Sequence, residues 1–498
     1  MNVNPITRLD YPDPDVIRVE DTYYMVSTTM HFMPGCEILQ SFDLVHWEHV
    51  TYVYETLDHT DAQQLKSGQN IYGQGMWAAS LRYHEGRFYI CFVANDTRKT
   101  YLYTSEKIDG PWKKQLIEGF YHDGSLLFDE DGRNYIVYGN DEIWITELNE
   151  DLTAPKKDGL HRLLVSDHKN PELGYEGSHI QKINGYYYIF LIHSLRDRWM
   201  RTEACFYSDS LEGEFTGGDV LCDDRGYCGQ GVAQGGIVDT PDGKWYAMLF
   251  QDSGAVGRIP ILVPVTWKDH FPVFGQNGHV PEEIEVHSTR PEYIYQPLVG
   301  SDDFCNGLLP RWQFNHDPDP RYYHLDALQG TYTITTREVC TELTQAVNTL
   351  TQRMSYPSCA AEVTVDASAL KEGDVAGLCA LQGCYAAVGI TKHHGKYEVL
   401  MLDKKEDGIL DMTERTVVES HQMDFRLEAD FCNMKDEARC YYRVNKGDWL
   451  PIGTVHKLYF KLDHFTGCRF GLFCYAAEET GGSACFRDFK YYDVDEIS

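Results

Sequence analysis

The sequence lacks several features that mark whole classes of protein. No positively charged and then apolar leader opens the chain, and no apolar run approaches the roughly 20 residues of a membrane helix. No basic run interrupts the formal net charge of −32, which argues against nucleic-acid and anionic-membrane partners. The 15 cysteines form no CxxC pair and no metal-ligand spacing. These absences predict a cytoplasmic protein that binds neither nucleic acid nor membrane.

Aromatic residues and strand-like alternation are what the chain has in abundance. Hydrophobic residues make up 43% of the 498 positions and aromatic residues 13%, with 34 tyrosines and 9 tryptophans. Such an excess is typical of β-rich folds and of proteins that stack ligands on rings. The length indicates more than one domain, and no long segment has the 3.6-residue period of a helix.

A loose repeat runs through the N-terminal half. Each unit has a polar turn followed by an aromatic-rich strand, at residues 20–26, 84–90, 131–137, 184–189 and 242–248. The units recur roughly every 45 to 65 residues, which is the spacing of four-stranded propeller blades. Five units predict a five-bladed β-propeller over residues 1–285, and a β-sandwich of repeated hairpins is the alternative interpretation.

The character of the chain changes after a proline-containing stretch at residues 281–300. We assign residues 286–300 to a linker. Short strand-like runs follow at 331–335, 360–365, 385–390, 397–402, 458–462 and 470–475. They predict a β-sandwich over residues 301–498, of the kind that serves as a carbohydrate-binding or supporting module. The complete expected architecture is all-β.

Three carboxylates stand just before the first strand of a predicted blade. Asp13 is held between Pro12 and Pro14, Asp123 precedes small residues and a hydrophobic strand, and Glu176 lies in a glycine-containing turn. The innermost strands of a propeller surround one axis, so these side chains are expected to meet at its mouth. Two facing carboxylates are what glycoside hydrolysis requires. Singly, each could be only a turn residue.

The combination of motifs resembles glycoside hydrolase family 43, the family of β-xylosidases, α-L-arabinofuranosidases and arabinanases. The motifs that carry this resemblance are Asn4-Pro5-Ile6, Pro12-Asp13-Pro14, Ser41-Phe42-Asp43-Leu44-Val45-His46-Trp47, Met76-Trp77-Ala78, Asp123-Gly124-Ser125-Leu126, Glu176-Gly177 and Asp239-Thr240-Pro241-Asp242-Gly243-Lys244-Trp245-Tyr246. They span the N-terminal half. Residues 301–304 and 312–316 are similar to the accessory sandwich of the family's xylosidases.

The resemblance implies an inverting mechanism with three acidic residues. Asp13 would be the general base that activates water, and Glu176 the general acid that protonates the leaving sugar. Asp123 would tune Glu176 and orient the substrate.

The resemblance also implies a sugar pocket. Arg258 would bind hydroxyls of the terminal sugar, and Trp77 and Phe32 would wall the pocket, although both rings could also be ordinary core aromatics. Gln234 stands where many members place a metal-associated histidine, and Asp15 stands where many carry serine. A neutral amide is a poorer ligand, so we expect no cofactor, with a structural calcium ion left open.

The sequence therefore predicts a cytoplasmic, exo-acting hydrolase that releases xylose or L-arabinose from short oligosaccharides during xylan breakdown. A small oligosaccharide is the expected partner, and a homo-oligomer is an expectation from the resemblance alone. Three alternatives stay open: a non-catalytic sugar-binding propeller, a structural propeller whose acids are turns, and an endo-arabinanase.

Overall fold

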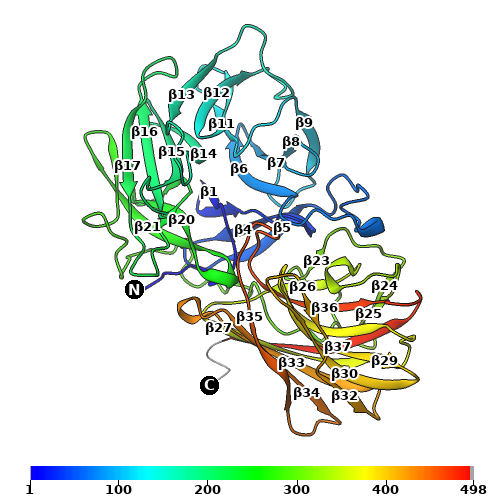
Figure 1. Cartoon of the computed structure of the whole chain (residues 1–498). Coiled ribbons are helices and arrows are strands. Elements are labelled where there is room, and N and C mark those ends of the chain that lie inside the picture. Colours follow the sequence, from blue (N-terminus) through cyan, green and yellow to red (C-terminus); the bar gives the residue numbers. More distant parts are fainter. Residues whose placement is uncertain (1, 494–498) are drawn as a thin grey trace.

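The computed structural model describes residues 2–493 and contains a five-bladed β-propeller followed by a sandwich of two β-sheets (Figure 1). The blades are four antiparallel sheets of four strands and one of five. Blade 1 has β1 (Asp15–Val19), β2 (Thr22–Val26), β4 (Gly35–Ser41) and β5 (Glu48–Tyr54); blade 2 has β6 (Met76–His84), β7 (Arg87–Ala94), β8 (Lys99–Ser105) and β9 (Lys113–Ile117). Blade 3 has β10 (Ser125–Phe128), β11 (Asn134–Asn140), β12 (Glu142–Leu148) and β13 (His161–Ser166); blade 4 has β14 (Glu176–Ile183), β15 (Tyr186–Ser194), β16 (Arg201–Ser208) and β17 (Thr216–Leu221). Blade 5 has β18 (Val232–Ala233), β19 (Ile237–Asp239), β20 (Trp245–Asp252), β21 (Arg258–Lys268) and β22 (Phe271–Phe274).

The aromatic runs of the repeat are the second strands of the five blades, β2, β7, β11, β15 and β20. Each of them is hydrogen-bonded on both sides, and its buried residues pack between neighbouring blades. Bulky aromatic and branched side chains suit such doubly paired strands. The repeat is therefore visible in sequence because the most buried strand recurs once per blade.

The N-terminal segment closes the ring by lying along blade 5. The side chain of Asn4 exchanges two hydrogen bonds of 2.8 Å with the backbone of Leu262, and the Ile6 N–H donates to the Pro260 carbonyl at 2.8 Å. The Tyr11 N–H then donates to the Arg258 carbonyl at 3.1 Å. Blade 1 is thereby fastened directly to blade 5, and Asp13 is delivered to the central channel.

The C-terminal half forms the two sheets of the sandwich. The first contains β3 (Phe32–Met33), β23 (Gln313–Asn315), β26 (Leu350–Arg353), β36 (Arg469–Tyr475), β28 (Val375–Leu381), β29 (Ala386–His393), β30 (Lys396–Lys404), β31 (Leu410–Asp411) and β32 (Arg415–Val418). The second contains β24 (Tyr323–Asp326), β25 (Thr331–Thr335), β37 (Ser483–Asp493), β27 (Ser358–Asp366), β33 (Gln422–Asp430), β34 (Glu437–Val444) and β35 (Leu450–Lys457). Four short 3-10 helices complete the elements: η1 (Lys66–Gly68), η2 (Gly254–Val256), η3 (Leu343–Gln345) and η4 (Cys432–Met434).

Two features of the sandwich were not foreseen. Its first sheet includes β3, which comes from the loop between two strands of blade 1, so the sheet crosses from one half of the chain to the other. The strand predicted at residues 458–462 is wrong, because β35 ends at Lys457 and an irregular loop follows as far as β36. That loop returns to the propeller, where the Cys468 N–H donates to the Ala255 carbonyl at 2.8 Å.

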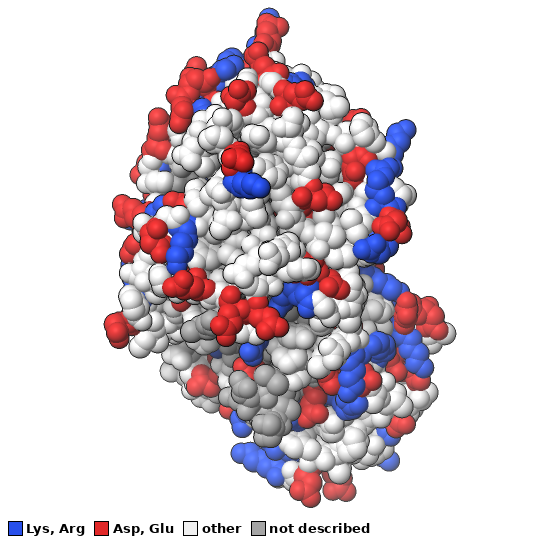
Figure 2. All heavy atoms as spheres, turned by 90° about the vertical axis from the view of Figure 1, so that its left-hand side faces the viewer, with Lys and Arg blue, Asp and Glu red and all other residues white. Residues whose placement is uncertain are grey.

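Acidic side chains are spread over the face in Figure 2, with lysine and arginine interspersed among them. No helix in residues 2–493 is long and apolar enough to cross a membrane.

Candidate active site

A cavity of about 590 Å³ opens at one end of the propeller channel. All five blades contribute to it through the start of an innermost strand, with the residues Asp13, Trp77, Asp123, Glu176 and Gln234. The sandwich contributes Met434, Phe460, Lys461, Leu462 and Phe465. Residues far apart in sequence therefore meet at this cavity, as predicted. Arg258 lines it as well, so that six of the seven predicted site residues are among its lining residues.

Asp13 is buried and held at both carboxylate oxygens. Thr28 donates its hydroxyl hydrogen to Oδ2 over 2.6 Å, and Arg258 donates from Nη1 to Oδ1 over 3.1 Å. The residue has a φ of 53°, in the left-handed region that costs a non-glycine residue free energy. A stiff segment and two fixed partners thus point one carboxylate into the cavity.

Asp15 lies deeper in the channel and serves the packing of blades. Its Oδ2 accepts the Leu81 N–H at 2.7 Å and a hydrogen from Arg82 Nη1 at 2.8 Å. Ser80 in blade 2 and Ser125 in blade 3 occupy the same position as Asp15. Ser80 Oγ accepts the Leu126 N–H of blade 3, and Ser125 Oγ accepts the Ile180 N–H of blade 4. The position belongs to a ring of inter-blade hydrogen bonds, which explains why an Asp can stand where a Ser would suffice.

Asp123, His122 and Glu176 form a charged group on one side of the cavity. His122 Nε2 lies 3.5 Å from Asp123 Oδ2 and 3.5 Å from Glu176 Oε2. Asp123 Oδ2 also accepts the Gly177 N–H at 2.9 Å, and Glu176 Oε2 accepts from Asn140 Nδ2 at 2.8 Å. The backbone turn that carries Glu176 is therefore tied directly to Asp123.

The electrostatics of this group follow from burial and mutual proximity. Burial, reinforced by the charges of Glu176 and Asp13, raises the pKa of Asp123 to about 6. The charge of Asp123, with help from Glu176, raises the pKa of His122 to about 9. At neutral pH the histidine is a cation between two acidic side chains.

Glu176 does not occupy quite the same place as the two aspartates. Asp13 and Asp123 each lie two residues before the position that makes the inter-blade hydrogen bond, which is Asp15 in blade 1 and Ser125 in blade 3. In blade 4 that position is His179, because the N–H of the next residue, Ile180, donates to Ser125 Oγ. Glu176 lies three residues before His179. A β-bulge between Glu176 and His179 supplies the extra residue. The bulge is accompanied by a φ of 65° at Gly177, where a Cβ atom would approach the Gln234 side chain to 2.7 Å.

Arg258 is the cation at the base of the cavity. Its side chain is 3% exposed, and its Nε and Nη2 atoms have no protein hydrogen-bond partner among the described residues. The ring of Phe465 lies 4.3 Å from the guanidinium carbon, and the Asp10 carboxylate accepts the Arg258 N–H at 2.8 Å. Two donors are thus fixed in direction and left for a ligand.

Of the three remaining predicted residues, Trp77 and Gln234 line the cavity and Phe32 does not. Trp77 lines the cavity, with its ring 5.9 Å from His122 and 5.5 Å from Phe465. Gln234 also lines it, and its backbone N–H donates to the buried Glu203 carboxylate at 2.7 Å. The prediction that Phe32 walls the pocket is wrong. Pairing of β3 with β23 turns this ring into the sandwich core, where the Arg469 guanidinium lies 3.4 Å above it.

Several cavity residues were missed by sequence reasoning. Asn140 ends β11 and Arg201 begins β16, where no motif marks them. His122 directly precedes Asp123 in the sequence, and no motif marks it either. Phe465 comes from a half of the chain that carried no site prediction at all. Their one common signal is a position at a strand end or in a loop facing the channel, and this becomes visible only once the blades are closed.

One group of residues in 2–493 has the proximity needed for a metal ion. The ligand atoms of His122, Asp123 and Glu176 lie within 4.8 Å of one another. Because His122 is a cation at neutral pH, it already supplies a positive charge beside the two acidic groups.

Comparisons with known proteins agree with this arrangement. The model of glycosyl hydrolases family 43 matches residues 3–272, and that of the beta-xylosidase C-terminal concanavalin A-like domain matches residues 301–492. The chain is 27% identical to a beta-xylosidase of Formosa agariphila, over 99% of this chain and 89% of the relative. It is 24% identical to a xylosidase/arabinosidase of Butyrivibrio fibrisolvens, over 99% of each chain.

Among solved structures, a bifunctional GH43-CE protein of Bacteroides eggerthii has a TM-score of 0.92 and 42% sequence identity. The match covers 98% of this chain but only 63% of that one, so this chain spans less than two thirds of the bifunctional protein. The first family model alone covers more than half of the sequence. The chain with this acid-lined propeller cavity therefore belongs to glycosyl hydrolases family 43.

Proposed function

We propose that the protein is an exo-acting, inverting glycoside hydrolase that releases xylose or L-arabinose from the ends of short oligosaccharides. The observation that carries the proposal is the meeting of Asp13, Asp123 and Glu176, from three different blades, with Arg258 in one cavity. Paired carboxylates flanking a sugar site are the chemistry of glycosidic bond hydrolysis. The two relatives, a beta-xylosidase and a xylosidase/arabinosidase, supply the pentose class.

The two principal carboxylates differ in surroundings in a way that suits an acid and a base. Asp13 is bound by a guanidinium and a hydroxyl, which hold both oxygens of its carboxylate in place. Its side chain is 8% exposed, whereas that of Glu176 is 19% exposed and therefore nearer the mouth. Asp13 would then act on water at the base of the cavity, while Glu176 would meet the outgoing part of the substrate.

In the proposed reaction Asp13 accepts a proton from a water molecule as the water oxygen attacks the anomeric carbon. The bond from that carbon to the glycosidic oxygen breaks, and Glu176 gives its proton to this oxygen. The product has inverted configuration because attack and departure occur on opposite faces. Asp123 holds the Gly177 N–H beside Glu176, and Arg258 orients the terminal sugar through Nε and Nη2.

The sandwich supports exo action. Its loop after β35 brings Phe460, Lys461, Leu462 and Phe465 to the cavity, so that one side is bounded by the second half of the chain. A bounded cavity suits the end of a chain, whereas an endo-arabinanase needs an open groove. This bounded side favours exo action over the endo alternative.

The test is proton NMR of the product anomer during hydrolysis of aryl β-D-xyloside and aryl α-L-arabinofuranoside. We expect one or both to be cleaved with inversion. Asp13→Asn should abolish turnover of all substrates, whereas Glu176→Gln should spare activated aryl substrates with good leaving groups more than disaccharides. Asp15→Ser is the matched control, because Ser occupies the corresponding place in blades 2 and 3.

The outcomes separate the candidate functions. Retained configuration would refute the inverting mechanism. Binding of sugar without turnover by the wild type would favour a non-catalytic binding protein. No stabilisation by either pentose in a melting assay would favour a structural propeller.

We further propose that the reaction needs no metal ion. The support is His122, whose charge beside Asp123 and Glu176 takes the place that a cation would fill. Activity should survive treatment with EDTA and dialysis. Loss of activity that added Ca²⁺ restores would overturn this proposal.

A cytoplasmic location is our proposal for the compartment. It is supported by the 15 cysteines, all free thiols in the structure. Fractionation of the producing cells should recover the activity with the cytoplasmic enzymes, and recovery from the medium would contradict it.

A further inference from the structure

We propose that Asp10 is a positioning residue, whose buried carboxylate joins the sandwich to Arg258 and so sets the direction in which the Arg258 guanidinium meets the terminal sugar. The proposal rests on the proposed hydrolase function, because it concerns the support of the cation at the base of the cavity. Asp10 is not one of the residues that line the cavity, so its effect on the reaction must pass through another residue.

The first observation is that the Asp10 side chain accepts one backbone N–H from each half of the chain. Oδ1 accepts the Arg258 N–H of blade 5 at 2.8 Å, and Oδ2 accepts the Gly467 N–H of the sandwich loop at 2.8 Å. Asp10 is 6% exposed, so water competes little for either bond. An aspartate is short and has two acceptor oxygens, and it can therefore bridge two N–H groups that lie close together.

The second observation is that the backbone on both sides of this bridge leaves no room for a side chain. A Cβ atom at Gly257 would lie 2.3 Å from Asp10 Oδ1, and the φ of 109° at Gly257 is one that glycine adopts readily. A Cβ atom at Gly467 would lie 2.7 Å from the Asp10 Cβ atom and 2.2 Å from the Val256 carbonyl oxygen. Two glycines thus allow both segments to approach Asp10 closely.

The third observation is that the bridge holds both members of the contact that covers Arg258. The Phe465 ring lies 4.3 Å from the Arg258 guanidinium carbon, and Phe465 is two residues before Gly467. Asp10 therefore fixes the backbone from which the Arg258 side chain starts and the loop that carries the ring packed on it. These supports set the direction of Arg258 Nε and Nη2, the two atoms left for the sugar.

The sandwich also holds the backbone on either side of the bridge. Gln382 Nε2 donates to the Ala255 carbonyl at 3.0 Å, in the turn that precedes this arginine. Arg353 Nε donates to the Asp10 carbonyl at 2.9 Å. The docking of the second domain is thus transmitted to the base of the cavity through buried hydrogen bonds.

The test is Asp10→Asn, which keeps the shape of the side chain and replaces one acceptor oxygen by an NH2 group. Because an NH2 group cannot accept an N–H, the bond to either Arg258 or Gly467 is lost. We expect kcat/KM for the cleaved aryl pentoside to fall about ten-fold or more, since a small misplacement of a substrate-orienting group is costly. A thermal melt checks that the variant is folded at the assay temperature.

A double-mutant cycle separates positioning from general destabilisation. Arg258→Lys keeps a cation beside Asp13 and removes Nε and Nη2. In that background Asp10→Asn should lower kcat/KM less than about two-fold, because the guanidinium that Asp10 positions is gone. Equal losses in the two backgrounds, or no loss in the wild-type background, would overturn the proposal and leave the hydrolase function intact.

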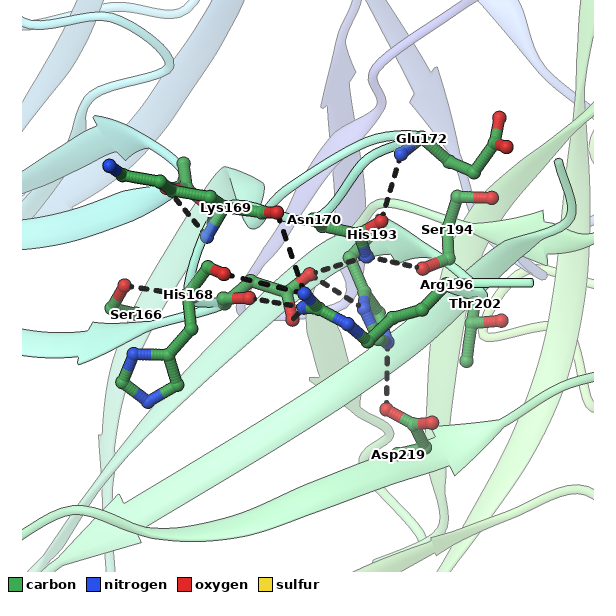
Figure 3. Close-up of polar contacts among 12 residues, drawn as sticks. Ser166, His168, Lys169, Asn170, Glu172, His193, Ser194, Arg196, Thr202 and Asp219 are labelled. Atoms are coloured by element: carbon green, nitrogen blue, oxygen red, sulfur yellow. Dashed lines mark hydrogen bonds and ion pairs between the residues drawn. The ribbon is translucent and has the colours of Figure 1, made fainter. Parts of the chain in front are cut away.

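Asp167→Asn is the matched control, because Asp167 is another buried aspartate that joins two loops. It is 8% exposed, and its Oδ2 accepts from Asn170 Nδ2 at 2.8 Å and contacts His193 Nδ1 at 3.1 Å, within the polar network shown in Figure 3. Its side chain holds blade 4 and not Arg258. Any loss of kcat/KM that it causes should be equal in the two backgrounds, and a loss that also disappears with Arg258→Lys would overturn the assignment to Asp10.

A second variant tests the same support from the sandwich if Asp10→Asn does not fold. Gln382→Met keeps the volume of the side chain and removes the donor to the Ala255 carbonyl, and its loss of kcat/KM should also disappear in the Arg258→Lys background. An equal loss in both backgrounds would overturn the proposal.

Binding distinguishes failure of this proposal from failure of the proposed function. If the wild type binds the pentose without cleaving it, the same cycle is read in dissociation constants by calorimetry, with the same expected and contrary outcomes. If the wild type neither cleaves the pentoside nor binds the pentose, the proposed function itself fails.

Discussion

Acid should destabilise this protein through three histidines buried between the propeller and the sandwich. His31 comes from the loop that carries β3, and His316 and His464 come from the sandwich. All three are buried, and His464 stacks on Tyr72 with ring centres 3.9 Å apart and planes at 7°. The His316 and His31 rings are 4.8 Å apart. A proton on any of these rings would place a charge in the interface.

The magnitude follows from the depressed pKa values. Burial lowers the pKa of His464 from 6.5 to about 4, and burial lowers the pKa values of His31 and His316 well below 6.5. Because the folded state binds fewer protons, these groups stabilise it fully above pH 6.5, and that stability is lost as the pH falls toward 4. Each histidine contributes a slope of about 1.4 kcal/mol per pH unit in this window. His464 alone accounts for about 3 kcal/mol.

The perturbation is His464→Phe, which keeps a flat ring against Tyr72 and removes the titrating group. Urea unfolding followed by tryptophan fluorescence, at steps from pH 7.5 to 4.5, should show a shallower loss of stability than in the wild type. The difference should approach about 3 kcal/mol at the acid end. His324→Phe is the control, because His324 is an exposed residue of β24.

Two results would refute the reasoning. One is a wild type whose free energy of unfolding is flat between pH 6.5 and 4.5. The other is an acid slope that His464→Phe leaves unchanged. Because His464 lies in the loop that lines the cavity, activity at low pH should fall together with stability, and substrate should protect against both losses.

Three further predictions concern the cavity and its support. Phe465→Leu should lower kcat/KM about 2- to 30-fold by removing the ring from Arg258, and initial-rate kinetics with unchanged unfolding curves would establish this. Glu203→Gln should make the free energy of unfolding rise more steeply with pH between about 5 and 7 than it does in the wild type. Burial raises the pKa of Glu203 well above 4.5, so its stabilisation is complete below about pH 4.5 and is lost as the pH rises toward the folded pKa. An equal pH dependence in the denaturation curves of both proteins would contradict this. His122→Gln removes the cation that lowers the pKa of Asp123, so the acidic limb of the pH–rate profile should move upward from about pH 6, and a downward shift would refute the assigned charge of His122.

Much of the fold could be predicted because its signals are local. Neighbours in sequence determine the aromatic second strands and the turns before them. The recurrence of these local features was sufficient to predict the propeller. The two prolines around Asp13 fix its backbone without help from the rest of the chain. The error at residues 458–462 has a simple cause: a short apolar run is compatible with a strand and with a loop that packs its side chains against another domain.

The candidate site could be predicted only in part. Asp13, Asp123, Glu176 and Arg258 were located because motifs surround them. Arg201 was not, since nothing near it in sequence distinguishes an arginine that lines the cavity from one in any other strand.

The sequence by itself determined the strand pattern, the repeat, the stiff segment at Asp13 and the identity of the acids, because each depends on residues that are neighbours along the chain. Only the tertiary structure decided that Phe32 packs into the sandwich, that a bulge sets Glu176 one residue apart from the aspartates, and that Phe465 closes over Arg258. These outcomes depend on closing a ring of blades and docking a second domain against it. Both bring together residues separated by hundreds of positions, whose contacts no local pattern encodes.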